Sequence, residues 1–233
     1  MTTGCALDGE GVVPQSLARP HRSFPSSSAR ATARRRVEGN TITECGIQGC
    51  IRAVGGPQVE IVGNHLATTA ERETSYGNVT GVVRSAIDAV STTTHVLIAN
   101  NIIEGLGGSF AFPEGAIRVR SGAEATVNDN VVTAAILAIT VDNGGVIQGS
   151  DNRLEAVGTA WSATGGTLVD QYSDAVAYDV AISGTAGLID VRCNWWGSTA
   201  GPGTVPEVAG LTVQYTPWAD QPVAGTGDRS CTP

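Results

Sequence analysis

The chain has 233 residues, enough for one domain or one elongated solenoid with a buried core. Aromatic residues make up only 5% of it and glycine reaches 30 residues, which favours thin stacked layers over a thick globule. The net charge is −8 and lysine is absent, which excludes a lysine base or Schiff base and makes nucleic acid an unexpected partner, because phosphate affinity requires clustered cations.

Residues 1–36 are predicted to be disordered, or to be a start codon placed upstream of the true domain. They are rich in Ser, Ala, Arg and Pro and follow the period of neither a strand nor a helix. The charged and then apolar pattern of a secretory signal is not visible in them. No run of about 18 apolar residues occurs along the chain, so no transmembrane segment is expected.

From residue 37 onward the sequence repeats itself along two lines. One line is an apolar segment that ends in asparagine at a turn, and it supplies Asn40, Asn64, Asn101, Asn130, Asn152 and Asn194. The other line is a small residue, an isoleucine and a polar residue, and it supplies Ile51, Ile87, Ile117 and Ile139. Internal repeats of this length decide the fold before any local pattern does.

The spacing between the two lines predicts a solenoid. The distance from each isoleucine to the following asparagine is 13 or 14 residues, whereas the distance from each asparagine to the next isoleucine varies from 9 to 23. Two strands and their turn are therefore held in register while one loop changes length. The shortest full turn, from Ile117 to Ile139, is 22 residues, and the 42 residues from Asn152 to Asn194 are close to two such turns.

A turn of this length fits three short strands joined by bends. The alternation of Ile51, Arg52 and Ala53 favours strands over helices. A leucine-rich repeat has a similar period but would show a regular comb of leucines, whereas Val, Ile and Thr dominate here. We therefore predict a parallel β-solenoid of about six or seven rungs, with the four isoleucines stacked inside.

The asparagines are predicted to be structural. Asparagine tolerates left-handed backbone geometry, and its side-chain amide can donate to the equivalent amide one rung along, which forms a ladder. We expect all six to hold turns and to bind no ligand.

The C-terminal part carries a family-specific pattern. It consists of Asn194-Trp195-Trp196-Gly197-Ser198, then Gly201-Pro202, then Tyr215-Thr216-Pro217-Trp218. This pattern resembles the closing segment of proteins of the pectate-lyase-like superfamily, which includes carbohydrate-binding and sugar-hydrolase repeats. The resemblance covers residues 191–218 and, more loosely, the coils from residue 37. It implies an all-β, single-stranded, right-handed parallel β-helix with its C-terminal cap over residues 37–220, followed by a flexible tail at 221–233.

Two adjacent tryptophans in a turn admit two interpretations. Trp195 and Trp196 could stack on sugar rings, or they could cover the open apolar end of the solenoid, and the Pro- and Gly-rich segment that follows favours the cap. Cys193 and Cys231 flank this cap and could join the tail to it. Two disulfides and a free thiol among the five cysteines would fit an extracellular protein, and five reduced thiols a cytosolic one.

The outward positions of the isoleucine line carry charges. Following each isoleucine are Arg52, Asp88, Arg118 and Thr140, and two residues further on are Val54, Val90, Arg120 and Asp142. In register, Arg52, Asp88 and Arg118 would lie about 4.8 Å apart per rung. They could bind a ligand, because arginine recognises the carboxylates of acidic sugars in bidentate pairs. They could equally be favourable cross-strand neighbours on a solvated sheet.

The resemblance also admits an enzyme, namely a polysaccharide lyase or glycoside hydrolase acting on acidic polysaccharide. Arg118 or Arg120 would then be the base or substrate clamp, and Asp88 and Asp142 would be acid–base carboxylates or Ca²⁺ ligands. Pectate-lyase-like enzymes use a tight acidic cluster with an Arg or Lys base, and polygalacturonase-like enzymes an Asp-Asp pair. This chain has no Lys and no Asp-Asp pair.

We therefore expect a non-catalytic extracellular or cell-surface module that interacts with polysaccharide, is monomeric, and needs no metal or cofactor. A structural spacer of a larger surface protein is the other alternative. The long segments 65–85 and 102–115 are further candidates for function, because solenoids carry function in such loops.

Overall fold

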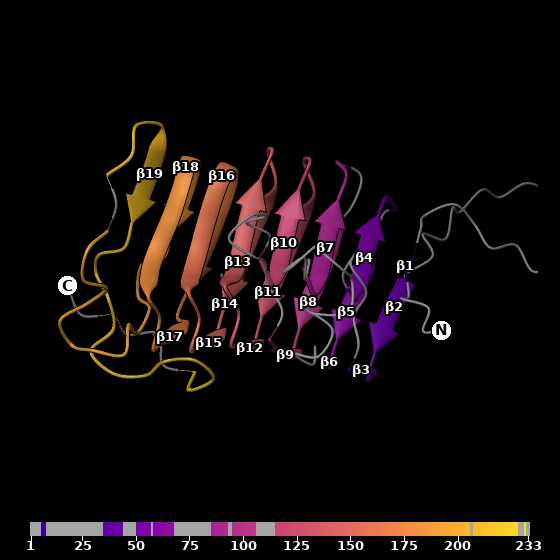
Figure 1. Cartoon of the computed structure of the whole chain (residues 1–233), viewed down its shortest axis with the longest axis horizontal. Helices are drawn as coiled ribbons and strands as arrows, with labels where there is room; N and C mark the ends of the chain where they lie inside the picture. The colour runs from indigo at the N-terminus through magenta and orange to yellow at the C-terminus, as the bar shows by residue number, and fades with distance from the viewer. Residues whose placement is uncertain are drawn as a thin grey trace, which may run out of the picture.

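The protein is an array of parallel strands stacked along one axis (Figure 1). Its structure is a computed structural model, and it describes residues 6–7, 35–43, 50–56, 58–67, 85–92, 95–105, 115–205, 207–227 and 231. Residues 1–36 therefore lie largely outside the described residues, as do most of the long segments 65–85 and 102–115. No helix among the described residues is long and apolar enough to cross a membrane.

The strands form three lines, and each turn of the chain adds one strand to each line. The first line contains β1 (Ala6–Leu7), β4 (Ile51–Val54), β7 (Ile87–Val90), β10 (Ile117–Arg120), β13 (Leu137–Asp142) and the first halves of β16 (Thr159–Gln171) and β18 (Val180–Asp190). The second line contains β2 (Arg35–Glu38), β5 (Val59–Val62), β8 (His95–Ala99), β11 (Glu124–Asn128), β14 (Val146–Ser150), the second halves of β16 and β18, and β19 (Leu211–Gln214).

The third line forms a separate six-stranded sheet. It contains β3 (Thr41–Ile42), β6 (His65–Ala67), β9 (Ile102–Glu104), β12 (Val131–Thr133), β15 (Arg153–Glu155) and β17 (Asp174–Val176). The first and second lines join into one 13-stranded sheet, because β16 and β18 run from one line into the other without a break. The predicted all-β parallel β-helix of about six or seven rungs is confirmed, and the structure has about six.

The core is a set of aligned apolar columns. In the first line Ile51 pairs with Ile87, Ile87 with Ile117, and Ile117 with Ile139, so the predicted stack is confirmed. Trp161 and Ile182 continue this column, and every member is at most 3% exposed. Each fully buried isoleucine contributes about 1.5–3 kcal/mol of hydrophobic stabilisation. A solenoid needs this alignment because each rung covers the next.

The asparagine ladder runs along the turn between the second and third lines. Its rungs are joined by side-chain amides, from Asn40 Nδ2 to Asn64 Oδ1 (3.0 Å), from Asn64 to Asn101 (3.0 Å), from Asn101 to Asn130 (2.9 Å) and from Asn130 to Asn152 (3.0 Å). From Asn64 onward these asparagines are 0–1% exposed. Each amide therefore satisfies a neighbour that water cannot reach.

The left-handed residue of this turn is the one before each ladder position, not the asparagine itself. These residues have φ between 56° and 65°, and they are Gly39, Gly63, Asn100, Asp129, Asp151, Tyr172 and Cys193. The tolerance of asparagine for that conformation therefore does not explain the ladder. Its side-chain amide does, since it offers a donor and an acceptor at the right height.

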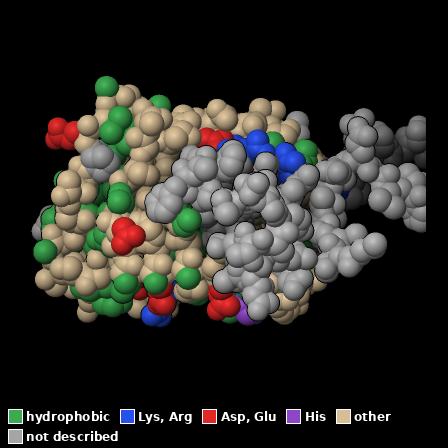
Figure 2. All heavy atoms as spheres, in the orientation of Figure 1, with side chains coloured by type: hydrophobic (Ala, Val, Ile, Leu, Met, Phe, Trp, Pro, Cys, Tyr) green, Lys and Arg blue, Asp and Glu red, His purple; other side chains and the backbone are tan. Residues whose placement is uncertain are grey.

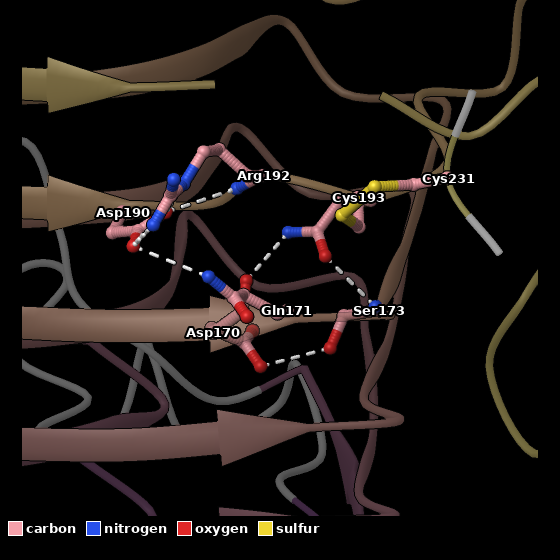
Figure 3. The surroundings of a disulfide bond; sticks show 8 residues. Asp170, Gln171, Ser173, Asp190, Arg192, Cys193 and Cys231 are labelled. Atoms are coloured by element: carbon pink, nitrogen blue, oxygen red, sulfur yellow. Dashed lines mark hydrogen bonds and ion pairs between the residues drawn. A yellow bond between two sulfur atoms is a disulfide. The ribbon is translucent and has the colours of Figure 1, made fainter. Parts of the chain in front are cut away.

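The C-terminal end of the helix is covered by aromatic rings and a returning tail. Trp196 is 2% exposed and packs edge-to-face on Trp161, with ring centroids 5.1 Å apart. Cys193 and Cys231 form a disulfide (Figure 3). The carboxylate of Asp174 accepts hydrogen bonds from the backbone amides of Val223 and Ala224, and Val223 is buried. Residues 219–227 thus lie against the last rungs.

Candidate functional site

The outward charged residues of the first line lie in the register that the sequence predicts. Arg52 pairs with Asp88 and Asp88 with Arg118, while Arg120 pairs with Asp142. Basic and acidic side chains adjoin one another over β4, β7 and β10 (Figure 2). The structure therefore brings all five charged candidates together on one face.

The two shortest contacts among these residues are diagonal, and the third joins directly opposite residues. The Arg120 guanidinium donates to both carboxylate oxygens of Asp88, at 2.9 Å each, and Arg118 donates to Asp142 at 2.8 Å. The Arg52 Nε atom lies 3.4 Å from Asp88 Oδ2. The bidentate pair of Arg120 with Asp88 is the strong form of a salt bridge.

The carboxylates of Asp88 and Asp142 are buried and already hydrogen-bonded, which does not favour a catalytic or calcium-binding role. Asp88 and Asp142 are each 7% exposed, and both already accept hydrogen bonds from guanidinium groups. Among the described residues, no three His, Cys, Asp or Glu side chains gather closely enough to hold a metal ion. The arrangement matches a cross-strand charge lattice.

A different acid, Asp170, has the most perturbed environment in the described chain. It lies inside the core, 0% exposed, where the ladder lacks an asparagine and has Ser173 instead. Its carboxylate accepts hydrogen bonds from Trp161 Nε1 (2.7 Å), Ser173 Oγ (2.8 Å) and Asn152 Nδ2 (3.0 Å). Figure 3 shows Asp170 turned toward Ser173.

Burial raises the pKa of Asp170 to about 6, although its three hydrogen bonds act in the opposite direction. The neighbouring rung makes room for it with a glycine, since a Cβ atom at Gly149 would lie 2.7 Å from Asp170 Oδ1. At the rung that has Ser173 in place of an asparagine, the Asp170 carboxylate accepts the hydrogen bond from Asn152 that a ladder asparagine would otherwise accept. It lies in the interior. It is therefore a structural residue.

A surface cleft lies at the C-terminal end of the first line. Its volume is about 490 Å³, and it lies between residues 178–184, which lead into and form the start of β18, and Pro202 and Thr204 of the cap. Tyr178 supplies an aromatic ring, Asp179 a carboxylate, and Val180 an apolar side chain that is 43% exposed. Ser183 and Thr204 add hydroxyl groups.

The ring of Tyr178 is held in place from behind. It packs edge-to-face on Trp196, with centroids 6.2 Å apart, and its hydroxyl donates to the Trp196 carbonyl oxygen at 3.3 Å. Burial raises the pKa of Tyr178, so the hydroxyl stays protonated and keeps donating. The cap tryptophan Trp196 thus faces inward and supports the cleft. Its neighbour Trp195 is half-buried and pairs through its backbone with Asp174.

Sequence reasoning did not find this cleft. The sequence indicates the cleft only through the position of one strand. The last strand before the Asn194-Trp195-Trp196 segment is followed by no further isoleucine rung that could cover that strand. Of the long candidate segments, His65 and Glu104 are described, and they form an exposed pair at 2.8 Å between β6 and β9. No protein-family model, curated protein or solved structure matches this chain.

Proposed function

We propose that the chain is a non-catalytic carbohydrate-binding module of an extracellular or cell-surface protein, and that it is related to the pectate-lyase-like superfamily. The cleft at the start of β18 carries this proposal. Its volume of about 490 Å³ falls in the range of small-molecule sites and suits one or two sugar rings.

The lining of the cleft has the mixed character that a sugar requires. Tyr178, Val180 and Pro202 present apolar surface to the CH faces of a pyranose. Asp179, Ser183 and Thr204 present acceptors and donors to its hydroxyl groups. A cleft with both kinds of group fits a polyhydroxylated ring better than it fits a purely apolar ligand.

The disulfides support a location outside the cytosol. Cys193 and Cys231 are bonded to each other, and Cys50 is also in a disulfide whose partner lies outside the described residues. Disulfides persist in secreted and surface proteins and are rare in the cytosol. Among the described cysteines, Cys50, Cys193 and Cys231 are all oxidised, which fits the extracellular alternative.

A glycan array probed with the whole chain, with and without Ca²⁺, tests this function. We expect binding to a subset of glycans that is independent of Ca²⁺ and is lost in Val180→Asp, which places a charge on the apolar wall of the cleft. Val208→Asp is the matched control, because Val208 is also an exposed valine but lies outside the cleft. No binding to any glycan would leave the structural spacer. Unsaturated uronate products would instead indicate a lyase.

A further inference from the structure

The second line ends at β19, and the outer edge of β19 has no neighbouring strand among the described residues (Figure 1). On the other side lies β18, and there the carbonyl oxygens of Gly210 and Gln214 accept hydrogen bonds. The backbone groups of successive strand residues point alternately to the two sides. Those of Val213 therefore point away from β18, as do the Leu211 carbonyl and the Tyr215 amide, and no described residue bonds to them.

This edge has none of the features that keep strand edges apart. Residues 210–216 contain no charged residue and no proline, and the pairing of β19 with β18 has no bulge. Sheet edges are usually protected from other chains by charged side chains, proline or a bulge. The N-terminal end of the second line is protected in this way, because Arg35, Arg36 and Glu38 of β2 are exposed charged residues. The C-terminal edge is therefore the one that can accept a further strand.

The inward side chains of β19 lack the cover that earlier rungs have. Val213 follows Ile189 in an apolar column whose members from Val59 to Ile189 are at most 4% exposed. Val213, Leu211 and Tyr215 pack against the core but are only half-buried. A hollow of about 410 Å³ lies between these three side chains and residues 205–209. The cap thus leaves the last rung open, and a solenoid end needs a cover.

We propose that β19 pairs with β19 of a second copy of this chain, antiparallel and about a two-fold axis at Val213. Directly opposite residues of an antiparallel pair lie on the same face of the sheet. With Val213 opposite Val213 of the second copy, Leu211 lies opposite Tyr215 on the inner face. Thr212 then lies opposite Gln214 on the outer face. The two apolar columns end against each other, and the contact closes at two copies.

The same register satisfies the free backbone groups. The two Val213 residues exchange both of their N–H to C=O hydrogen bonds, and each Tyr215 amide donates to the Leu211 carbonyl oxygen of the other copy. The Leu211 amide needs no new partner, because it already donates to the Val208 carbonyl oxygen at 3.1 Å. The hydrogen bonds between the copies therefore form at the groups that β18 leaves free.

A head-to-tail contact between β19 and β2 of the next copy fits less well. Arg35 is in register with the inward residue Val59, so this contact would place its charge at the end of an apolar column. Each copy would also keep one free end, and the assembly would grow into a filament. The tail-to-tail contact has neither cost.

The dimer does not rest on carbohydrate binding. The cleft at the start of β18 is lined by residues 178–184, Pro202 and Thr204, and none of these belongs to β19. Loss of either property by a variant can therefore be measured separately from the other.

Sedimentation equilibrium of the whole chain, from about 1 µM to about 1 mM, tests the pairing. We expect a reversible change from the monomer mass to twice that mass as the concentration rises, with no larger species. The monomer mass at every concentration would overturn the proposal. Masses that grow beyond the dimer would also overturn it, because a two-fold contact closes at two copies.

Two matched double variants test the register. Thr212 and Gln214 are both exposed, so substitutions there should leave the β-helix intact. Thr212→Lys with Gln214→Lys places like charges opposite each other and should weaken dimerisation roughly tenfold, although its two positive charges reduce the net charge of −8. Thr212→Lys with Gln214→Glu places opposite charges there and should dimerise as the parent does. Equal dimerisation by the two variants would refute the register.

Hydrogen exchange locates the contact without a variant. The Val213 amide should exchange slowly in the dimer and fast on dilution, because its acceptor belongs to the second copy. The Leu211 amide is the internal control, since it donates to Val208 in both states. A dimer whose Val213 amide exchanges as fast as in the dilute chain would refute pairing through β19.

Discussion

The contribution of Asp170 to the free energy of unfolding is expected to fall as the pH rises from about 4 to about 7, because its carboxyl group must lose its proton inside the core. Its pKa is about 6 in the folded chain and 3.8 when unperturbed. The folded state therefore binds the proton more tightly than the unfolded state. Stability from this group is fully present below pH 3.8 and is lost as the pH rises through about 6.

The size of the effect follows from the shift. At about 1.36 kcal/mol per pKa unit, raising the pKa from 3.8 to about 6 corresponds to roughly 3 kcal/mol between the two ends of this range. Asp170→Asn removes the ionisable group and keeps a side chain of the same shape. Its stability relative to the parent should therefore improve by roughly 3 kcal/mol between pH 4 and pH 7.

Urea unfolding at half-unit pH steps, for the parent, Asp170→Asn and the exposed control Asp220→Asn, measures this difference. Subtracting each variant from the parent removes the contributions of the other carboxylates, some of which act in the opposite direction. Parallel stability curves for the parent and Asp170→Asn would refute the reasoning, since they would show that Asp170 does not titrate in this range. A difference of the same size for Asp220→Asn would show that the effect does not arise from the burial of Asp170.

Three further substitutions test the scaffold. Ile117→Asp buries an unpaired charge between two rungs and should abolish the cooperative melting transition seen by circular dichroism, and an unchanged transition would contradict the stacking. Asn101→Ala removes the acceptor of the Asn64 backbone and side-chain amides and the side-chain donor to Asn130, and should cost about 3 kcal/mol in urea unfolding. A loss within about 0.5 kcal/mol would show that the ladder is not stabilising. Arg120→Ala deprives the buried Asp88 of its bidentate partner and should cost about 1–3 kcal/mol without changing glycan affinity in calorimetry. Loss of glycan binding would show that the charged residues of the first line belong to the binding site.

The repeat alone was enough to predict the β-helix. A constant distance of 13 or 14 residues from each isoleucine to the next asparagine leaves two strands and a turn in fixed register, and the stack of Ile51, Ile87, Ile117 and Ile139 follows from it. The asparagine ladder was predictable for the same reason. Residues at equivalent positions of a solenoid must lie one above another.

The one missing ladder position could not be interpreted from the sequence. The interval of 42 residues between Asn152 and Asn194 indicated two turns, but nothing in it marks Ser173 as the substitute rung. Only the structure shows that Asp170 reaches across to Ser173 and Asn152, because the vacant volume results from the short serine side chain and from Gly149 in the neighbouring rung.

The contacts among the charged residues of the first line could likewise not be predicted from the sequence. The sequence placed Arg52, Asp88 and Arg118 side by side, but it could not tell that Arg120 would form a bidentate pair with Asp88, since a diagonal contact depends on side-chain conformation and on the twist between strands. The cleft depends on where the chain after Trp196 crosses the end of the helix. Register along the strands is set by a local period that can be read from the sequence, whereas the path of the cap results from packing between segments with no common period.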